Sequence, residues 1–140
     1  MSLLVPQRRK HRKVALWRLK WIASNATDVS FWEFWLKAVS NWYITSRQIE
    51  SARKVIIRYI RKTWKIWIRI FPDVPVTKKP LEVKMGWWKW AVDHYMARIR
   101  RWRVLFEING VNHDLAKEIF KQASYKLPVQ TKTIAKWELN

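Results

Sequence analysis

The sequence contains no cysteine, which excludes a disulfide framework, a thiolate nucleophile and a zinc ribbon. It has only two glycines, whereas an average usage of about 7% would give roughly ten in a chain of this length. Turns with positive φ depend on glycine, so another residue type must occupy such positions here. No run of 18 apolar residues is present, and the sequence therefore predicts no membrane-spanning helix.

Acidic residues are also scarce, with 10 Asp and Glu against 29 Lys and Arg, which gives a net charge of +19. A small free domain with this charge repels itself, and the imbalance favours a polyanionic partner. The basic residues are spread over every predicted element and do not form one amphipathic face, which favours nucleic acid over an anionic membrane surface. The length of 140 residues predicts one domain, residues 15–140, preceded by a basic arm, residues 1–14.

Hydrophobic periodicity predicts an α+β fold in which a mixed or antiparallel sheet is covered by two helices. The first helix is expected from Thr45 to Lys62, because Thr45 and Gln48 form a capping box. The second is expected to follow the N-cap Asn112 and to stop before Pro128. The residues expected to face the core are Ile49, Ala52, Ile56, Tyr59 and Ile60 in the first helix, and Leu115, Ile119, Phe120 and Ala123 in the second.

Strands are predicted where apolar residues alternate or cluster between turn signals. Within residues 65–80, KIWIRIFPDVPVTKKP, alternation predicts a strand that Pro72 ends, and Pro75 and Pro80 predict an extended connection. A tight turn is expected at Arg101 and Trp102, and Asn109–Gly110 gives a positive-φ signal. The remaining predicted strands are a short one within residues 27–39, then residues 91–100, 104–108 and 131–136.

Reactive groups do not converge on a recognisable catalytic motif. The histidines are far apart in the chain, and no serine elbow or phosphate-cradling glycine loop accompanies them. Each aspartate has a simpler role as a turn or cap residue. We therefore predict no enzyme, no cofactor and no metal site; the candidates considered are His11, His94, His113, Asp28, Asp73, Asp93 and Asp114.

Basic residues interleaved with aromatic rings are typical of RNA binding, because cations neutralise phosphates and rings stack on unpaired bases. Composition alone predicts no more than an RNA-binding α+β domain. Two alternatives stay open beside a structural role in a ribonucleoprotein. One is a free single-stranded RNA-binding protein or an assembly factor; the other, supported only by the charge, is an enzyme or membrane-surface protein.

Six blocks, in order, resemble the bacterial and organellar large-subunit ribosomal protein L-sixteen family: TDVSFWEFWLKAV, ITSRQIESARK, KIWIRIFPDVPVTKKP, VKMG, RVLFEINGV and LAKEIFKQASYKLPVQTK. The resemblance implies a structural protein of α/β-hammerhead type that binds large-subunit rRNA near the base of the central protuberance. It also implies that the protein lines the corridor of the A-site tRNA and joins late in assembly. The implied partners are large-subunit rRNA, A-site tRNA and neighbouring ribosomal proteins; we expect neither a membrane partner nor a homo-oligomer.

The resemblance also assigns residues to these roles. The rRNA-binding residues implied are Arg8, Arg9, Lys10, His11, Arg12 and Lys13 of the arm, Arg47, Arg53, Lys54, Arg58 and Arg61 of the first helix, and Lys65, Arg69, Lys78 and Lys79. The loop implied to reach towards the tRNA and the peptidyl-transferase region consists of Lys84, Met85, Gly86, Trp87, Trp88, Lys89 and Trp90.

The chain departs from this family at its glycines. Nine of its 12 tryptophans stand where the family carries glycine: Trp17, Trp21, Trp32, Trp35, Trp42, Trp64, Trp88, Trp90 and Trp102. One hypothesis is that most of these residues are glycine in the living molecule, because a reassigned codon has been read as Trp. The other is that the indoles are real and stack on RNA. A codon of variable meaning favours a mitochondrial ribosome, and otherwise a bacterial or plastid one.

Overall fold

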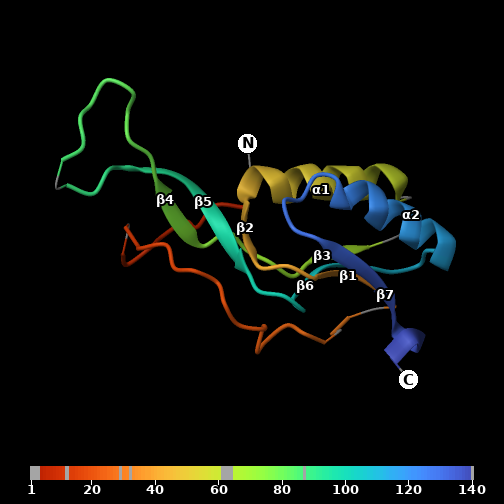
Figure 1. The fold of residues 1–140 in the computed structure, drawn as a ribbon. Helices are drawn as coiled ribbons and strands as arrows, with labels where there is room; N and C mark the ends of the chain where they lie inside the picture. The colour runs from red at the N-terminus through yellow and green to blue at the C-terminus, as the bar shows by residue number, and fades with distance from the viewer. Residues whose placement is uncertain are drawn as a thin grey trace.

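The computed structural model describes residues 4–11, 13–28, 30–31, 33–60, 65–86 and 88–139. Its α-helices are α1 (Ser46–Tyr59) and α2 (His113–Ser124), and a 3-10 helix spans Lys136–Leu139. Its strands are β1 (Phe34–Ala38), β2 (Trp42–Thr45), β3 (Ile66–Ile68), β4 (Val74–Thr77), β5 (Val92–Ile99), β6 (Val104–Ile108) and β7 (Thr131–Ala135). These elements confirm the predicted α+β class with two helices (Figure 1).

The strands form two antiparallel sheets where the sequence predicted one sheet. One sheet has the order β3-β6-β1-β7 and the other the order β2-β5-β4. The predicted turn at Arg101 and Trp102 is present, but it carries the chain from β5 in one sheet to β6 in the other. Both helices lie side by side on one face of the four-stranded sheet (Figure 1).

The capping signals correctly mark where both helices begin. The Gln48 backbone N–H donates to Thr45 Oγ1 at 3.2 Å, and the Thr45 N–H donates to Gln48 Oε1 at 2.9 Å. Asn112 caps α2 by accepting a hydrogen bond from the His113 N–H at 2.7 Å. The predicted core stripes are buried except at their margins: Leu115 and Ile60 are partly buried, and Tyr59, in the last turn of α1, is 39% exposed.

The predicted strand within residues 27–39 is restricted to β1, which begins at Phe34. The ladders of β1 with β6 and β7 both begin at Phe34, and the described residues before it make other contacts. They cross the face of the sheet opposite the helices, where the Val104 N–H donates to the Ala26 carbonyl at 2.9 Å and the Ala23 N–H donates to the Arg101 carbonyl at 3.1 Å. β1 and β6 are consequently covered on both faces.

Two strands were not predicted. β2 follows directly on a turn and is only four residues long, too short for its alternation to be recognised. β4 contains Pro75, for which the sequence predicted an extended connection without strand pairing. β4 is an edge strand beside β5, and an edge position accommodates a residue that has no N–H to donate.

Two of the tryptophans that the resemblance places at family glycine positions lie in unusual surroundings. Trp102 has φ 73°, in the left-handed region, and it is the third residue of a turn closed by the Arg103 N–H donating to the Arg100 carbonyl. Trp35 is 1% exposed, and its indole Nε1 has no hydrogen-bond partner. The backbone of Trp102 favours the glycine hypothesis at that position. Trp35 does not, because its indole packs against Val104 and Ile134 in the interior and glycine would leave a cavity there. Trp32 and Trp64 lie outside the described residues.

Comparing glycine with alanine at Trp102 isolates the cost of the left-handed backbone, because both variants lose the indole and its contact with Lys37. The left-handed conformation costs a residue with a side chain about 1–2 kcal/mol. We expect Trp102→Gly to have a free energy of unfolding in urea about 1 kcal/mol higher than Trp102→Ala. At Trp42, in strand β2, the order should be reversed, because glycine is less favourable than alanine within a strand. A Trp102→Gly variant no more stable than Trp102→Ala would contradict the strain at this position.

Candidate nucleic-acid interface

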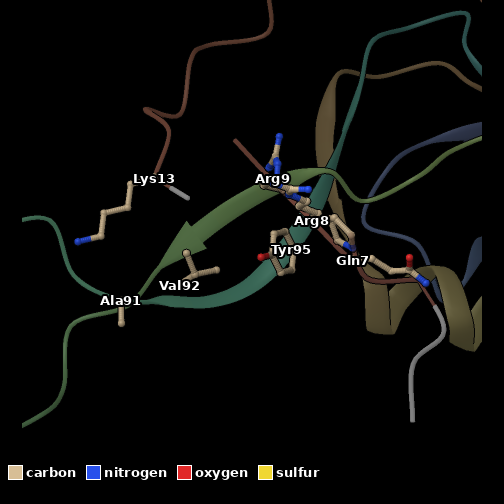
Figure 2. A pocket seen from close by; sticks show the side chains of 8 residues that line it. Gln7, Arg8, Arg9, Lys13, Ala91, Val92 and Tyr95 are labelled. Atoms are coloured by element: carbon tan, nitrogen blue, oxygen red, sulfur yellow. The ribbon is translucent and has the colours of Figure 1, made fainter. Parts of the chain in front are cut away.

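The basic arm lies against the three-stranded sheet. Pro6, Gln7, Arg8, Arg9 and Lys13 line a hollow of about 710 Å³ together with Ala91, Val92 and Tyr95 (Figure 2). The Lys13 ammonium donates a hydrogen bond to the backbone carbonyl of Lys89, which fastens the arm to the base of the predicted tRNA-facing loop. Lys10 and His11 are exposed, and Arg12 lies outside the described residues. The fold therefore brings two predicted binding segments together.

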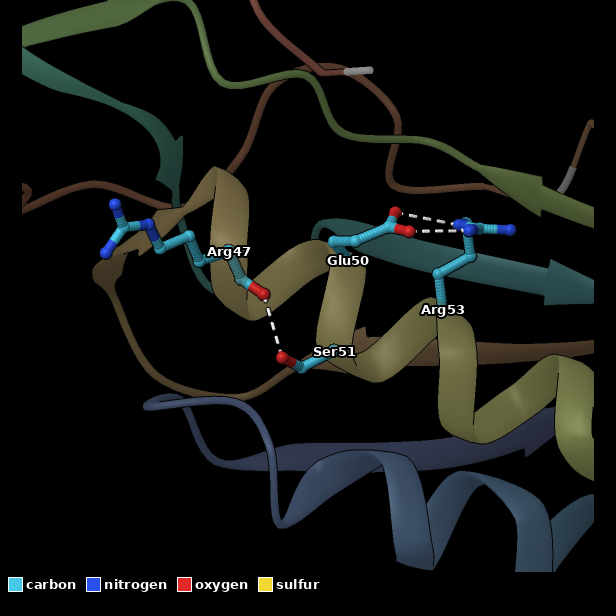
Figure 3. A network of polar contacts seen from close by, with 4 residues as sticks. All are labelled: Arg47, Glu50, Ser51 and Arg53. Carbon is cyan, nitrogen blue, oxygen red and sulfur yellow. Dashed lines mark hydrogen bonds and ion pairs between the residues drawn. The ribbon is translucent and has the colours of Figure 1, made fainter. Parts of the chain in front are cut away.

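The cations of α1 divide into two groups. Arg47, Lys54 and Arg58 are exposed, while Arg53 donates from Nε and Nη2 to the Glu50 carboxylate at 2.8 and 2.5 Å (Figure 3). This hydrogen bond lowers the pKa of Glu50 and raises the pKa of Arg53. The charge of Arg53 is consequently compensated by Glu50 within the helix, so Arg53 is a weaker candidate for binding a phosphate than the exposed cations of α1. Arg61 is outside the described part of the chain.

Arg69, another predicted rRNA-binding residue, compensates a buried charge. Its Nη1 donates to Oε1 of Glu107 at 2.5 Å, and Glu107 is fully buried on β6. The second carboxylate oxygen of Glu107 accepts a hydrogen bond from the Phe31 N–H at 3.0 Å. The Arg69 guanidinium also lies 5.0 Å from the centroid of the Phe31 ring. Arg69 thus joins the segment before β1 to β6.

The predicted tRNA-facing loop projects away from both helices, between β4 and β5 (Figure 1). Met85 and Trp88 are 80% and 70% exposed, and Lys84 and Lys89 are exposed as well. A Cβ built on Gly86 would meet no atom within 4 Å, so the chain itself does not require glycine there. Lys78 and Lys79 are exposed at the base of the loop, and Lys65 is exposed before β3; Trp87 lies outside the described residues.

Sequence reasoning missed the arginines of the β5–β6 connection. Residues 98–103 read RIRRWR, a basic run that could have been recognised, but it was interpreted only as a strand end and a turn. Arg98, Arg100 and Arg101 are exposed, and Arg103 is half-buried. Burial lowers the pKa of Arg103, and the nearby charges of Arg69 and Arg100 act in the same direction.

His94, one of the histidines considered as a possible base, has a local partner. His94 Nδ1 lies 2.7 Å from Asp93 Oδ2, and this hydrogen bond lowers the pKa of Asp93, as do the charges of Lys78 and Arg47. Thr45, Ser46, Arg47 and Lys78 line the hollow of about 310 Å³ that the pair faces. Among the described residues, no group of three or more His, Cys, Asp or Glu is placed to hold a metal ion. In the same part of the chain, no helix is both long and apolar enough to cross a bilayer.

Exposed cations lie on the arm, on a helix and on a projecting loop. This arrangement is typical of a structural protein that binds the phosphate groups of a nucleic acid. The chain belongs to the ribosomal protein L16p/L10e family, whose model matches residues 6–134. The family consists of structural ribosomal proteins, so this chain is not an enzyme.

Individual relatives match over nearly the whole chain. The large ribosomal subunit protein uL16 of Halorhodospira halophila is 53% identical over 129 residues, which cover 92% of this chain and 94% of the relative. The protein uL16 of Francisella tularensis subsp. novicida is 49% identical over 134 residues, 96% of this chain and 98% of the relative. The protein uL16c of Emiliania huxleyi is 46% identical over 134 residues, 96% of this chain and 97% of the relative.

Removing Arg69 is expected to destabilise the protein more than removing any exposed cation. Arg69→Met leaves the buried Glu107 carboxylate without its counter-charge and should lower the free energy of unfolding by about 3 kcal/mol. Lys65→Met, an exposed control four positions away, should change it by less than about 0.5 kcal/mol. The double variant Arg69→Met with Glu107→Leu should recover most of the stability, because no uncompensated charge stays buried. A double variant as unstable as the single one would refute this role of Arg69.

Proposed function

We propose that this chain is a structural constituent of the large ribosomal subunit, where it binds large-subunit rRNA and contacts neighbouring ribosomal proteins. The observation that carries the proposal is the match of 92–96% of the chain to proteins named large ribosomal subunit protein uL16. The net charge of +19 supports it, because a rigid polyanion is what such a domain needs in order to lose its self-repulsion.

Within that function, the exposed cations of the arm, of α1 and of the loop base are the rRNA-binding residues. Arg8 and Lys10 are exposed on the arm, and Arg47, Lys54 and Arg58 are exposed on α1. Cations arranged in this way bind phosphates of more than one RNA segment, so the protein acts as a brace between segments.

The projecting loop is proposed to line the corridor of the A-site tRNA, near the base of the central protuberance, and the protein to join the subunit late in assembly. Support comes from the loop's exposure and from its two lysines, Lys84 and Lys89. The open space around Gly86 adds to it, because only a partner that approaches the backbone closely would require glycine at that position.

The type of ribosome to which the protein belongs is inferred from the same relatives. The relatives come from bacteria and from Emiliania huxleyi, which supports a ribosome of bacterial type. A mitochondrial ribosome stays a prediction, whose support is the hypothesis of a reassigned codon.

A second candidate function is that of a free single-stranded RNA-binding protein or assembly factor. One observation favours it: Leu16, Trp17, Trp42 and Tyr43 line an open groove of about 500 Å³ beside Arg18 and Lys20. Indoles at such a groove can stack on unpaired bases. This platform is absent if Trp17 and Trp42 are glycine in the living molecule.

Sedimentation distinguishes the two functions. We expect the protein to co-sediment with large subunits in a sucrose gradient, because its exposed cations are proposed to bind phosphates of the assembled rRNA. Recovery in the soluble fraction, with RNA binding that needs no ribosome, would favour the second function instead.

The contribution of the cations can be measured on isolated large-subunit rRNA. Lys54→Gln combined with Arg58→Gln should reduce the slope of log K against log salt by roughly 0.7–0.9 for each phosphate that is no longer neutralised. Arg53→Gln is the matched control on the same helix and should reduce the slope less, because Arg53 is already paired with Glu50. Equal slopes in wild type and the double variant would mean that these residues form a solvated face.

Cross-linking tests the position of the loop. A photoreactive amino acid at Met85, an exposed residue, should cross-link to tRNA only in ribosomes whose A site is filled. The same group at Tyr125, also exposed but on the helical side, serves as the control and should give no tRNA product. Cross-links from Met85 to rRNA alone, unchanged when the A site is filled, would refute the corridor assignment.

A further inference from the structure

We propose that a cleft between the two sheets, lined by Arg9, Arg98 and Arg103, binds a phosphate group of an RNA strand. The inference rests on the proposed function and adds to it a site that the arm and the β5–β6 connection form together. Neither Arg98 nor Arg103 was among the residues that the sequence assigned to RNA.

The cleft has a volume of about 800 Å³, and three parts of the chain form its walls. The arm contributes Leu4, Arg9 and Val14, and β5 contributes Ala97, Arg98 and Ile99. The third wall consists of residues 68–71 with Asp73 and Arg103. The lining mixes apolar side chains with charged ones, and the cleft is open to solvent.

Positive charge dominates the cleft. Four arginines and one carboxylate, Asp73, line it. The charge of Arg69 is already compensated by Glu107, and Asp73 can compensate only one of the remaining three guanidinium groups. The lining therefore carries about two uncompensated positive charges, which a phosphodiester on an RNA backbone would reduce.

Arg9 and Arg103 line the cleft, and each has one buried nitrogen without an acceptor among the described residues: Nη1 of Arg9 and Nε of Arg103. Because these two atoms are covered, a phosphate accepts from them only after the guanidinium groups turn towards the cleft. A buried donor on a charged group is costly unless an acceptor satisfies it. Phosphate oxygens satisfy guanidinium donors with the geometry that arginine favours, two parallel hydrogen bonds from one fork. Burial also disfavours the charged form of Arg103, and this is the direction in which its pKa is shifted.

The continuity of the basic surface favours RNA over the carboxylate of a neighbouring protein. Arg9 lines both this cleft and the hollow that holds Arg8, Lys13 and Tyr95 (Figure 2). A polymer with a phosphate at every residue can occupy both hollows in succession, whereas a single carboxylate occupies only one. Figure 2 shows the side chains of Arg8 and Arg9 next to Tyr95, which is positioned to pack against a sugar or base of the same strand.

The experiment compares Arg98→Gln with Arg101→Gln in the full-length protein. Both residues are exposed arginines three positions apart, but only Arg98 lines the cleft. Binding to deproteinised large-subunit rRNA is measured across a series of KCl concentrations. We expect Arg98→Gln to reduce the log-log salt slope by roughly 0.7–0.9 more than Arg101→Gln does. Arg103→Lys, which keeps the charge but removes the fork and Nε, should weaken binding while changing the slope less.

A second measurement distinguishes binding of free inorganic phosphate from binding of a phosphate in the RNA backbone. The Tm of the free protein is followed in inorganic phosphate and in chloride at constant ionic strength. A phosphate-dependent rise in Tm for wild type and Arg101→Gln, absent in Arg98→Gln, would support an anion site that accepts the group without the polymer. A slope effect without a rise in Tm would support a site that needs the RNA backbone.

Other results would overturn the proposal. If Arg98→Gln and Arg101→Gln reduce the slope equally and phosphate does not raise Tm, the cleft holds no phosphate. If Arg98→Gln binds naked rRNA as wild type does but fails to enter large subunits, the occupant is a carboxylate of a neighbouring protein. If the wild-type protein fails to co-sediment with large subunits, the proposed function is refuted. If the wild-type protein co-sediments but Arg98→Gln binds RNA as Arg101→Gln does, only the phosphate site in the cleft is refuted.

Discussion

An excess of positive charge that the chain cannot balance by itself is the constraint on which this structure depends. Its carboxylates are few, and the structure uses them at particular places: Glu107 neutralises Arg69 in the interior, and Glu50 neutralises Arg53 on α1. Most of the other described cations are exposed, on the arm, on α1, around the loop and in the β5–β6 connection, while Arg103 is half-buried. Folding therefore produces a stable core but leaves an electrostatic cost that only a polyanion removes. The interface that we propose is the part of this charge that no carboxylate of the chain compensates.

The fold could be predicted from sequence where local chemistry decides it. The capping box at Thr45 and the cap at Asn112 mark both helix starts, and the five-residue strand β6 was predicted with its observed bounds. Prediction was incomplete where tertiary context decides. Because Pro75 has no N–H to donate, the edge strand β4 was predicted as an unpaired connection. The alternation before Phe34 predicted a strand, but the pairing of β1 with β6 and β7 begins only at Phe34. The division into two sheets depends on which edges pair, and no local pattern records it.

The candidate site shows the same division. The basic arm and the loop were recognisable from charge and family resemblance, but sequence could not show that Lys13 touches Lys89 or that Arg69 is committed to Glu107. Both facts concern residues far apart in the chain that only the fold brings together. The basic run at residues 98–103 could be seen in the sequence, but it was interpreted only as the end of a strand and a turn. Trp102 in a left-handed conformation and the unsatisfied indole of Trp35 give the tryptophan question a physical basis that family comparison alone does not supply.

The hydrogen bond from Lys13 to the carbonyl of Lys89 links the arm to the base of the projecting loop. The two residues are 76 positions apart in the chain. One exposed hydrogen bond contributes only about 0.5–1.5 kcal/mol, so it restrains these two segments weakly. Their relative position is therefore sensitive to any change that removes the Lys13 ammonium or displaces the Lys89 carbonyl.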